Sequence, residues 1–530
     1  MAGDRVAAGR HGGAGRAGGA MTPNGPFAPG GGAAALIRRG EAEAGAWRFR
    51  LEEEGWRDLV ATLARDPLPF VGLWADGQDV HALFLEGGER VLVASVAPYG
   101  GRYLGLSGVR PAASLPERCV HDLWGFEAME ARDTRPWLDH GVWTATWPLG
   151  PRPGPVSWPP DPPEFRPQPG GGTILGIGPA DGGHHTPGHL RLALGGRDTV
   201  GGAEWRLGYA HRGVMARLCG LDAPAAVRLA GRAAAGASVA HQSALCRAIE
   251  AASDSMVGTG TERCRVLLAE IERVATHLHD VARTARAAGA TALAAECEYL
   301  RESVMDLCGR MFGHRLLMDL VRPEGPDGHA GAGDAEDGAA IAAVARQVAD
   351  LVRGRMRVVG RCRDWPGLEA RVVGRGVLGE HTARMLGVGG VAGRASAREE
   401  DLRRLVPGYR LGWLDTGVRR AGDVAARIDL RLAEIGGSVR ILESAGADGP
   451  LPGTGTPPRR DGEGVGCAEG PRGAVWYWVR MEGGAVRAAH VRDPALAHVA
   501  ALEHVLAGAD ADDVAMIVRS FGLSAAAADL

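Results

Sequence analysis

The chain has 530 residues, a formal net charge of −3 and 60 basic residues, all of them arginine. The nearly balanced charge excludes a global field that would attract nucleic acid or an anionic membrane surface. The absence of lysine excludes Schiff-base catalysis and a P-loop lysine. No apolar run is long enough to span a bilayer.

The chain begins with a segment that is low in complexity. Residues 1–34 are rich in glycine and alanine, so we expect a disordered tail. Residues 151–172 carry prolines at a density that neither a helix nor a central strand tolerates. They predict an extended linker that separates two domains, at residues 35–150 and 173–530.

Residues 35–150 have the pattern of a small α+β domain. Short apolar runs separated by glycine-containing turns predict strands and hairpins, and an apolar stripe predicts one helix. The strands are expected at residues 70–74, 80–85 and 91–96, and the helix at residues 56–64.

Residues 173–530 are predicted to be mainly helical. Apolar residues between Leu267 and Val281 recur at spacings of four and three, which predicts a helix over residues 262–283. A second helix over residues 292–312 should end at Gly313. Such helices favour an antiparallel bundle. Further helices are predicted at 224–251, 339–358 and 421–443, and exposed loops at 324–338 and 446–473.

The eight cysteines contain no C-x-x-C pair, so they predict buried, reduced structural thiols instead of disulfides or a metal site. No glycine-rich fingerprint follows a strand and opens a helix, so nothing local supports NAD binding.

A series of ordered motifs carries a family resemblance. In the second domain the clearest motif is R-L-G-Y-A-H-R-G, and further segments typical of one family of redox proteins lie on both sides of it. The segments are 176–179, 187–192, 206–213, 270–278, 312–319, 390–396, 471–473 and 512–514. Together they resemble the large subunit of membrane-bound [NiFe] hydrogenases and its D-type counterpart in complex I, the NADH-quinone oxidoreductase. Residues 116–126 (PERCVHDLWGF) resemble the signature of the C-type complex I protein, which is fused to the large subunit in formate hydrogenlyase-type proteins.

The resemblance implies an α+β fold in two parts. An α+β domain like the C-type complex I protein should precede a mainly α-helical large-subunit domain with small β-sheets. In hydrogenases of this family four thiolates hold nickel and iron. Here the corresponding positions hold Ala234, Ala237, Ala495 and His498. One imidazole and three methyl groups cannot rebuild a soft tetrathiolate site, so we expect no metal in this chain.

The quinone-reducing branch of the family implies other site residues. There a loop histidine and a tyrosine serve the quinone headgroup, and their positions here hold Pro187 and Ala235. A carboxylate relay position holds Met215, and a second one holds Ala474. Quinone reduction needs proton donors within hydrogen-bond reach. The candidate cavity residues are His184, His185, His189, His211 and Arg212, although a Gly/His surface loop is the alternative interpretation of 182–189.

The resemblance implies a component of an oxidoreductase complex and not a hydrogenase in its own right. A quinone is the expected ligand, a [4Fe-4S] cluster belongs to a B-type iron–sulfur partner (the small subunit), and H-type and antiporter-like partners of complex I lie in the membrane. The family's complexes bind NAD, but the resemblance implies that a different protein of the complex binds it, and not this chain. The chain itself is expected in the cytoplasm, peripheral at the inner face of the membrane. Two alternatives stay open: a non-catalytic scaffold between soluble and membrane arms, and an active [NiFe] hydrogenase.

Overall fold

The computed structural model describes residues 32–43, 45–141, 143–154, 172–180, 188–209, 211–323, 334–406, 408–409, 414, 417–445 and 460–530. Helices and several small sheets alternate along the chain, which confirms the predicted α+β class. The predicted loop histidines His184 and His185, with Pro187, lie outside the described residues, and so does most of the proline-rich linker.

A five-stranded sheet forms the core of the N-terminal unit, in the order β1-β2-β5-β4-β3. β2 pairs with β5 in parallel, and the other pairs are antiparallel. The three predicted strands and the predicted helix are present. The strands are β1 (Glu41–Ala42), β2 (Arg48–Leu51), β3 (Phe70–Ala75), β4 (Val80–Glu86) and β5 (Arg90–Val96), and the helices are α1 (Ala33–Ile37), α2 (Glu53–Leu63) and α3 (Ser114–Trp124). Helix α1 begins at Ala33, and most of the predicted tail, residues 1–31, lies outside the described residues.

Alternate residues of β4 face opposite sides of this sheet, as a pleated strand requires. Ala82 and Phe84 belong to the cluster that contains Leu59 and Leu63 of α2. Leu83 instead joins a second buried cluster that includes tryptophans from the C-terminal half of the chain. The sheet is therefore covered on both faces, which explains its nearly continuous apolar strands.

Two further sheets lie beyond the N-terminal unit. The first has the order β10-β9-β8 and the second the order β11-β12-β13, and neighbours in both are antiparallel. Their strands are β8 (Thr173–Ile177), β9 (His189–Leu194), β10 (Val200–Arg206), β11 (Gly462–Gly470), β12 (Gly473–Glu482) and β13 (Ala485–Arg492), while β6 (Arg102–Leu104) and β7 (Glu127–Met129) form a small parallel pair.

A bundle of long helices follows the predicted apolar periodicity. Gly313 ends the second of them with φ +73°, as predicted for a helix C-terminus. The first is buried around nearly its whole circumference. Its polar residues Glu270 and Arg273 therefore lie inside the protein, where they pair with each other. The long helices are α7 (Thr259–Ala287), α8 (Thr291–Phe312), α9 (Asp334–Arg363) and α13 (Val424–Glu443).

The remaining helices are short. They are α4 (Val214–Leu218), α5 (Ala223–Ala230), α6 (Ser238–Ala252), α10 (Pro366–Val372), α11 (Glu380–Met385), α12 (Gly390–Ala395), α14 (Ala495–Leu506), α15 (Val514–Phe521) and α16 (Ala525–Asp529). Within the part of the chain that the structure describes, none of the helices is at once long and apolar enough to cross a bilayer.

Three predictions about local structure were wrong. The helix predicted over 224–251 is broken into α5 and α6. Gly236 lies between them with φ +80°, a left-handed backbone conformation that does not occur inside a right-handed helix. The site also leaves little room for a side chain, since a Cβ there would lie 3.1 Å from Thr276 Oγ1. Part of the predicted loop 446–473 is strand β11. Its alternating glycines allow close packing on α6, since a Cβ at Gly464 would lie 2.1 Å from the Ala248 carbonyl oxygen. Residues 334–338, predicted as loop, begin α9.

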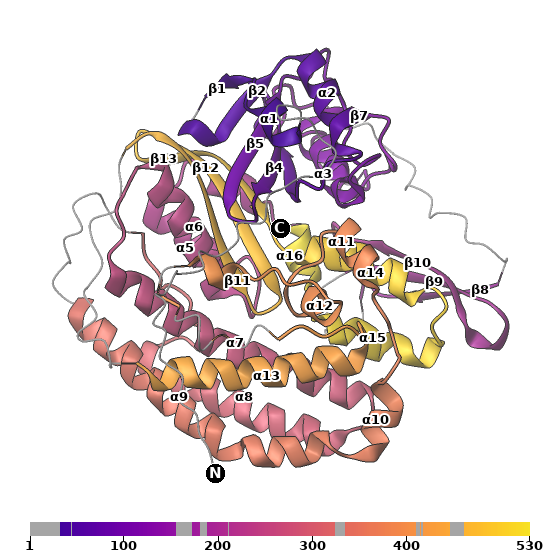
Figure 1. The fold of residues 1–530 in the computed structure, drawn as a ribbon, viewed down its shortest axis with the longest axis vertical. Helices are drawn as coiled ribbons and strands as arrows, with labels where there is room; N and C mark the ends of the chain where they lie inside the picture. The colour runs from indigo at the N-terminus through magenta and orange to yellow at the C-terminus, as the bar shows by residue number, and fades with distance from the viewer. Residues whose placement is uncertain are drawn as a thin grey trace, which may run out of the picture.

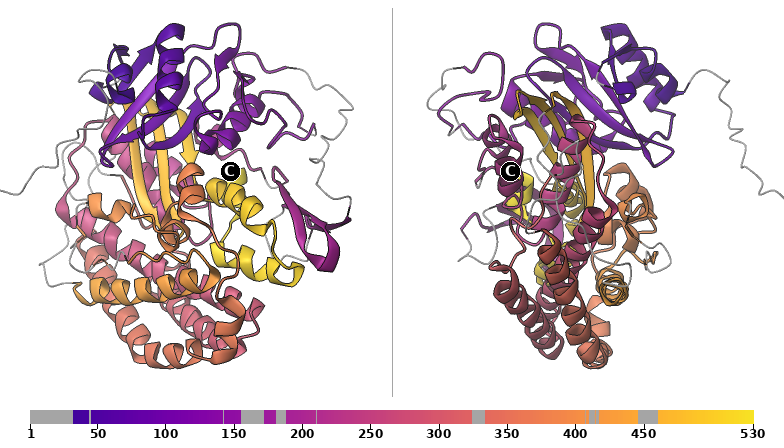
Figure 2. Two further views of the ribbon diagram at one scale, coloured as in Figure 1. Left: turned by 45° about the vertical axis from the view of Figure 1, so that its right-hand side comes forward. Right: turned by 90° about the vertical axis from the view of Figure 1, so that its left-hand side faces the viewer.

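The β11–β13 sheet lies between the N-terminal unit and the long helices (Figures 1 and 2). Trp74 of β3 stacks on His490 of β13 with ring centroids 5.1 Å apart, and it also contacts Trp478. Arg480 pairs with Asp76 at 2.7 Å across the same seam. The N-terminal unit is thus fixed directly to the sheet that precedes α14.

Candidate functional site

The first pair of altered ligand positions lies in the break between α5 and α6. Ala234 and Ala237 are both buried there. Arg212 holds the start of this loop, because its guanidinium donates to the carbonyl oxygens of Arg232 at 2.9 Å and Ala233 at 2.6 Å. The predicted site residue Arg212 therefore contacts the loop backbone.

The second pair lies on the first turn of α14, where Ala495 and His498 are buried. Asp493, just before this turn, accepts a hydrogen bond from the Ala495 amide at 2.7 Å. The other Asp493 oxygen lies 3.1 Å from Nε2 of His241 on α6, and Nδ1 of His241 lies 2.8 Å from the Tyr477 hydroxyl. This buried chain joins the segments that carry the two altered pairs.

A buried cluster of charges lies beside the first pair. Asp280 of α7 accepts two hydrogen bonds from Arg472, at 2.9 and 3.1 Å, and lies 3.5 Å from Arg431 of α13. Arg472 also donates to the Ala235 carbonyl oxygen at 3.4 Å. Burial alone would raise the pKa of Asp280, but the two guanidinium groups hold that pKa well below its ordinary value.

A small pocket of about 100 Å³ opens next to this cluster, and Ala235 forms part of its wall. Burial raises the pKa of Glu272 to about 7, even though the carboxylate accepts hydrogen bonds from the Val239 and Ala240 amides at 2.8 and 3.1 Å. Apolar side chains complete the wall. The lining includes Ala235, Gly236, Ile271, Glu272, Thr276, His279, Arg301, Val304, Met305, Arg315 and Arg472.

The residues at the four altered positions do not fit a nickel–iron centre. Three are methyl groups, and the fourth is a histidine whose two ring nitrogens have no hydrogen-bond partner among the described residues. Burial, with Arg431 and Arg472 nearby, lowers the pKa of His498 to about 3. A neutral imidazole can bind a metal, but one imidazole does not supply the thiolate set that this centre requires. No group of three or more potential ligands is found in the described parts of the chain.

The predicted histidines within the described residues lie outside the small pocket. His189 is on β9 and half-buried. His211 stacks on Trp143 with ring centroids 4.9 Å apart, and its Nδ1 lies 2.5 Å from the Asp529 carbonyl oxygen. It lines a separate cavity of about 430 Å³ together with Met215. Their roles in a cavity stay predictions.

The arginines of the motifs differ in environment. Arg273 and Arg394 are fully buried: Arg273 pairs with Glu270 at 3.0 Å, and Arg394 pairs with Asp401 at 3.4 Å and Glu469 at 3.3 Å. Their interactions hold elements together. Arg315 instead is half-exposed and lies at the small pocket.

The motif comparison did not identify the polar residues of α7 at the small pocket, although their spacing in the sequence could have indicated them. Glu272, Thr276, His279 and Asp280 are spaced by four, three and one along α7, so they share one helical face. All four lie near the break before α6: three line the pocket, and Asp280 binds Arg472. Polar residues at this spacing inside a buried helix indicate a polar site.

The fold and the arrangement of these segments define a large subunit of the class that unites complex I and the membrane-bound hydrogenases. A family model described as "Respiratory-chain NADH dehydrogenase, 49 Kd subunit" matches residues 288–453. The D subunit of NADH-quinone oxidoreductase from Geobacillus thermodenitrificans is 30% identical over 324 residues, which cover 58% of this chain and 85% of that protein. The chain belongs to the family of NADH-quinone oxidoreductase D subunits.

Other relatives extend the likeness to hydrogenases. The carbon monoxide-induced hydrogenase of Rhodospirillum rubrum is 25% identical over 65% of this chain and 95% of that protein. Formate hydrogenlyase subunit 5 of Escherichia coli is 26% identical over 58% of this chain and 53% of that protein. A chain of an archaeal membrane-bound sulfane sulfur reductase has the same fold, with a TM-score of 0.60, 22% identity, and coverage of 68% of this chain and 98% of that chain.

Proposed function

We propose that this chain is the metal-free large subunit of a membrane-associated, complex I-like redox complex, and that it forms a quinone-type cavity next to an iron–sulfur partner. The observation that carries the proposal is the small pocket at Ala235. It places a carboxyl group whose pKa is about 7, on Glu272, beside the arginines Arg301 and Arg472.

This chemistry suits a quinone headgroup. Reduction of a quinone to a quinol takes two electrons, which the partner's cluster would deliver, and two protons. Arginine N–H groups can donate hydrogen bonds to a carbonyl oxygen, and a carboxyl group that titrates near neutral pH can transfer a proton. Ile271, Val304 and Met305 supply apolar contact for the ring. The volume of about 100 Å³ is small, so we expect lining side chains to move when a headgroup enters.

The exposed face of strand β8 supports a surface that a partner protein covers. Ile174, Leu175 and Ile177 are between 37% and 44% exposed, and β8 is an edge strand. Exposed apolar edges of this kind are normally covered by another chain. We propose the iron–sulfur small subunit as the protein that covers it, with the H-type and antiporter-like membrane proteins beyond, and no nucleic acid. We propose accordingly that the chain lies in the cytoplasm at the inner face of the membrane.

A non-catalytic scaffold is the second candidate, and two substitutions favour it. Met215 and Ala474 stand where the family has carboxylates that relay protons. A thioether and a methyl group cannot transfer a proton. In this alternative the Asp280–Arg472–Arg431 cluster has only a structural role, joining α7, α13 and the turn before β12.

Replacing Glu272 by glutamine in the isolated complex distinguishes the two candidates. We expect quinone-dependent turnover to fall by about 10² or more, the usual contribution of a general acid. In the unmodified complex, turnover should fall as the pH rises through about 7, because the protonated form of Glu272 is lost. Glu298→Gln, which alters an exposed ion pair with Arg286, is the control. Unchanged turnover in Glu272→Gln would favour the scaffold.

A further inference from the structure

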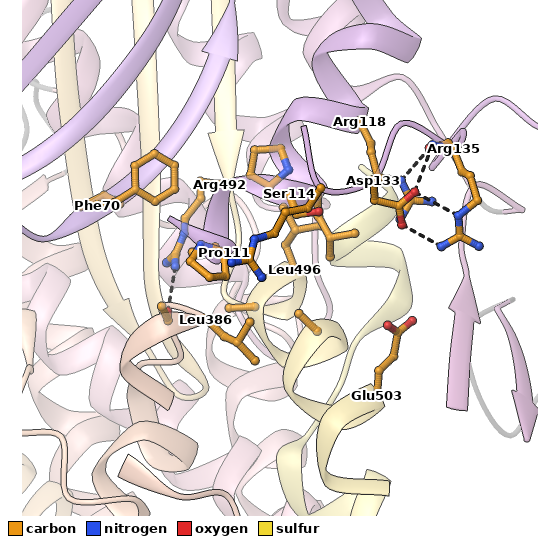
Figure 3. Close-up of a pocket in the computed structure, with 18 residues that line it drawn as sticks. Phe70, Pro111, Ser114, Arg118, Asp133, Arg135, Leu386, Arg492, Leu496 and Glu503 are labelled. Carbon is orange, nitrogen blue, oxygen red and sulfur yellow. Dashed lines mark hydrogen bonds and ion pairs between the residues drawn. The ribbon is translucent and has the colours of Figure 1, made fainter. Parts of the chain in front are cut away.

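A further cavity, separate from the small pocket and from the cavity at His211, is lined in part by α14. It has a volume of about 460 Å³, within the roughly 300–1,000 Å³ usual for ligand sites. Its walls come from the N-terminal unit, from the end of β13 and from α14 (Figure 3). Neither the predicted site residues nor the proposed quinone chemistry uses it.

The polar lining of this cavity carries an excess of positive charge, since four arginines and two acidic residues contribute to it. Arg118 and Arg135 are neutralised by Asp133, at 3.3 and 2.7 Å, and Arg135 also pairs with Glu204. In Figure 3 this group lies on one side of the cavity and Arg492 on the other.

The other two arginines have no carboxylate within ion-pair distance among the described residues. Arg492 donates to the carbonyl oxygens of Ala474 at 3.1 Å and Gly387 at 3.3 Å. Within the described ranges, the Arg132 guanidinium donates one long hydrogen bond, of 3.4 Å, to the Gly108 carbonyl oxygen. Burial lowers the pKa of Arg492 to about 10, so its charge is held at a free-energy penalty that an anion would offset.

The rest of the lining is apolar. Phe70 and Val71 of β3, Leu386 after α11 and Leu496 of α14 are half-buried, so each keeps surface that a ligand can cover. Guanidinium groups bind carboxylates and phosphates through paired, charge-assisted hydrogen bonds. A ligand that satisfies both parts of the lining has an apolar body and one anionic end.

We propose that this cavity binds a small amphipathic organic anion, a carboxylate with an apolar ring or chain, whose charged end is held by Arg132 and Arg492. The site is distinct from the proposed quinone cavity. Because Leu496 and Ala497 line it while Ala495 and His498 face the core, a bound anion contacts the helix that carries the second altered ligand pair.

The test measures binding of 2-naphthoate, and of its neutral amide, to the purified full chain by isothermal titration calorimetry. We expect one molecule of 2-naphthoate per chain and no measurable binding of the amide. Arg132→Ala should weaken binding at least about tenfold, since its exposed side chain can be removed without loss of a buried ion pair. Arg487→Ala, on the exposed side of β13, should leave the affinity unchanged.

Ala497→Phe adds a second variant, which fills the cavity and should abolish binding while the chain stays folded by circular dichroism. The proposal is overturned if 2-naphthoate does not bind, if the amide binds equally well, or if Arg132→Ala retains full affinity. Loss of binding once the chain is assembled into its complex would also overturn it, because a partner's acidic group would then occupy the site. Quinone turnover is not part of the readout, so this test and that of Glu272 can fail independently.

Discussion

Replacing Glu434 by alanine is expected to lower the free energy of unfolding by about 4 kcal/mol, or to prevent folding. Glu434 is fully buried on α13, where it contacts Arg394 and lies 2.8 Å from His277 Nε2 and 3.7 Å from Arg403. Its removal leaves cationic groups inside the protein with too few carboxylates. The loss of charge balance, and not the loss of one contact, produces the large effect.

Urea denaturation followed by circular dichroism measures this change. Glu380→Ala is the matched control. Glu380 lies on α11 and forms an exposed ion pair with Arg384, four residues further along that helix. Such pairs contribute less than about 0.5 kcal/mol. Equal, small changes in both variants would mean that the buried network is not needed for stability.

The second large effect concerns pH and His498. The pKa of this histidine is lowered to about 3 in the folded protein, against an ordinary value of about 6.5. Between these values the unfolded chain binds the proton more tightly, so stability is lost as the pH falls below about 6.5. From pH 7 to pH 5 the loss attributable to His498 is about 2 kcal/mol.

His498→Leu removes this contribution. The fall in unfolding free energy between pH 7 and pH 5 should be about 2 kcal/mol smaller than in the unmodified chain. The charged groups that act on His498 are Asp493, Arg431, Arg472 and Arg492, and they are unchanged in the variant. His504→Leu, at an exposed position of the same helix, is the control. An unchanged pH dependence in His498→Leu would show that this imidazole is protonated or solvated in the folded state.

Regular periodicity made much of the fold predictable from the sequence. The apolar spacing along α7 and the glycine at the end of α8 identified both helices, and the short apolar runs identified β3, β4 and β5. Apolar spacing, a helix-ending glycine and short apolar runs are all set by residues that are close together in the sequence, so they can be recognised without the structure. β11 was missed because its glycines look like loop composition, whereas they permit the sheet to approach α6 closely.

The candidate site was less predictable. The motifs located the loop before α6 and the start of α14, and both segments do lie beside buried polar groups. Their residue types also excluded the thiolate site. The pocket itself depends on Glu272 and Arg301, which come from α7 and α8 and meet only through helix packing. Their pKa values and proximity follow from burial, which no spacing rule provides.

The measurement that tests the central claim most directly is the nickel content of the isolated complex, determined by mass spectrometry of its metals. Iron is expected from the partner's cluster, so nickel is the informative element. The methyl groups of Ala234, Ala237 and Ala495 predict no nickel above background. One nickel per chain would contradict the account, because it would require a ligand set that these positions do not contain.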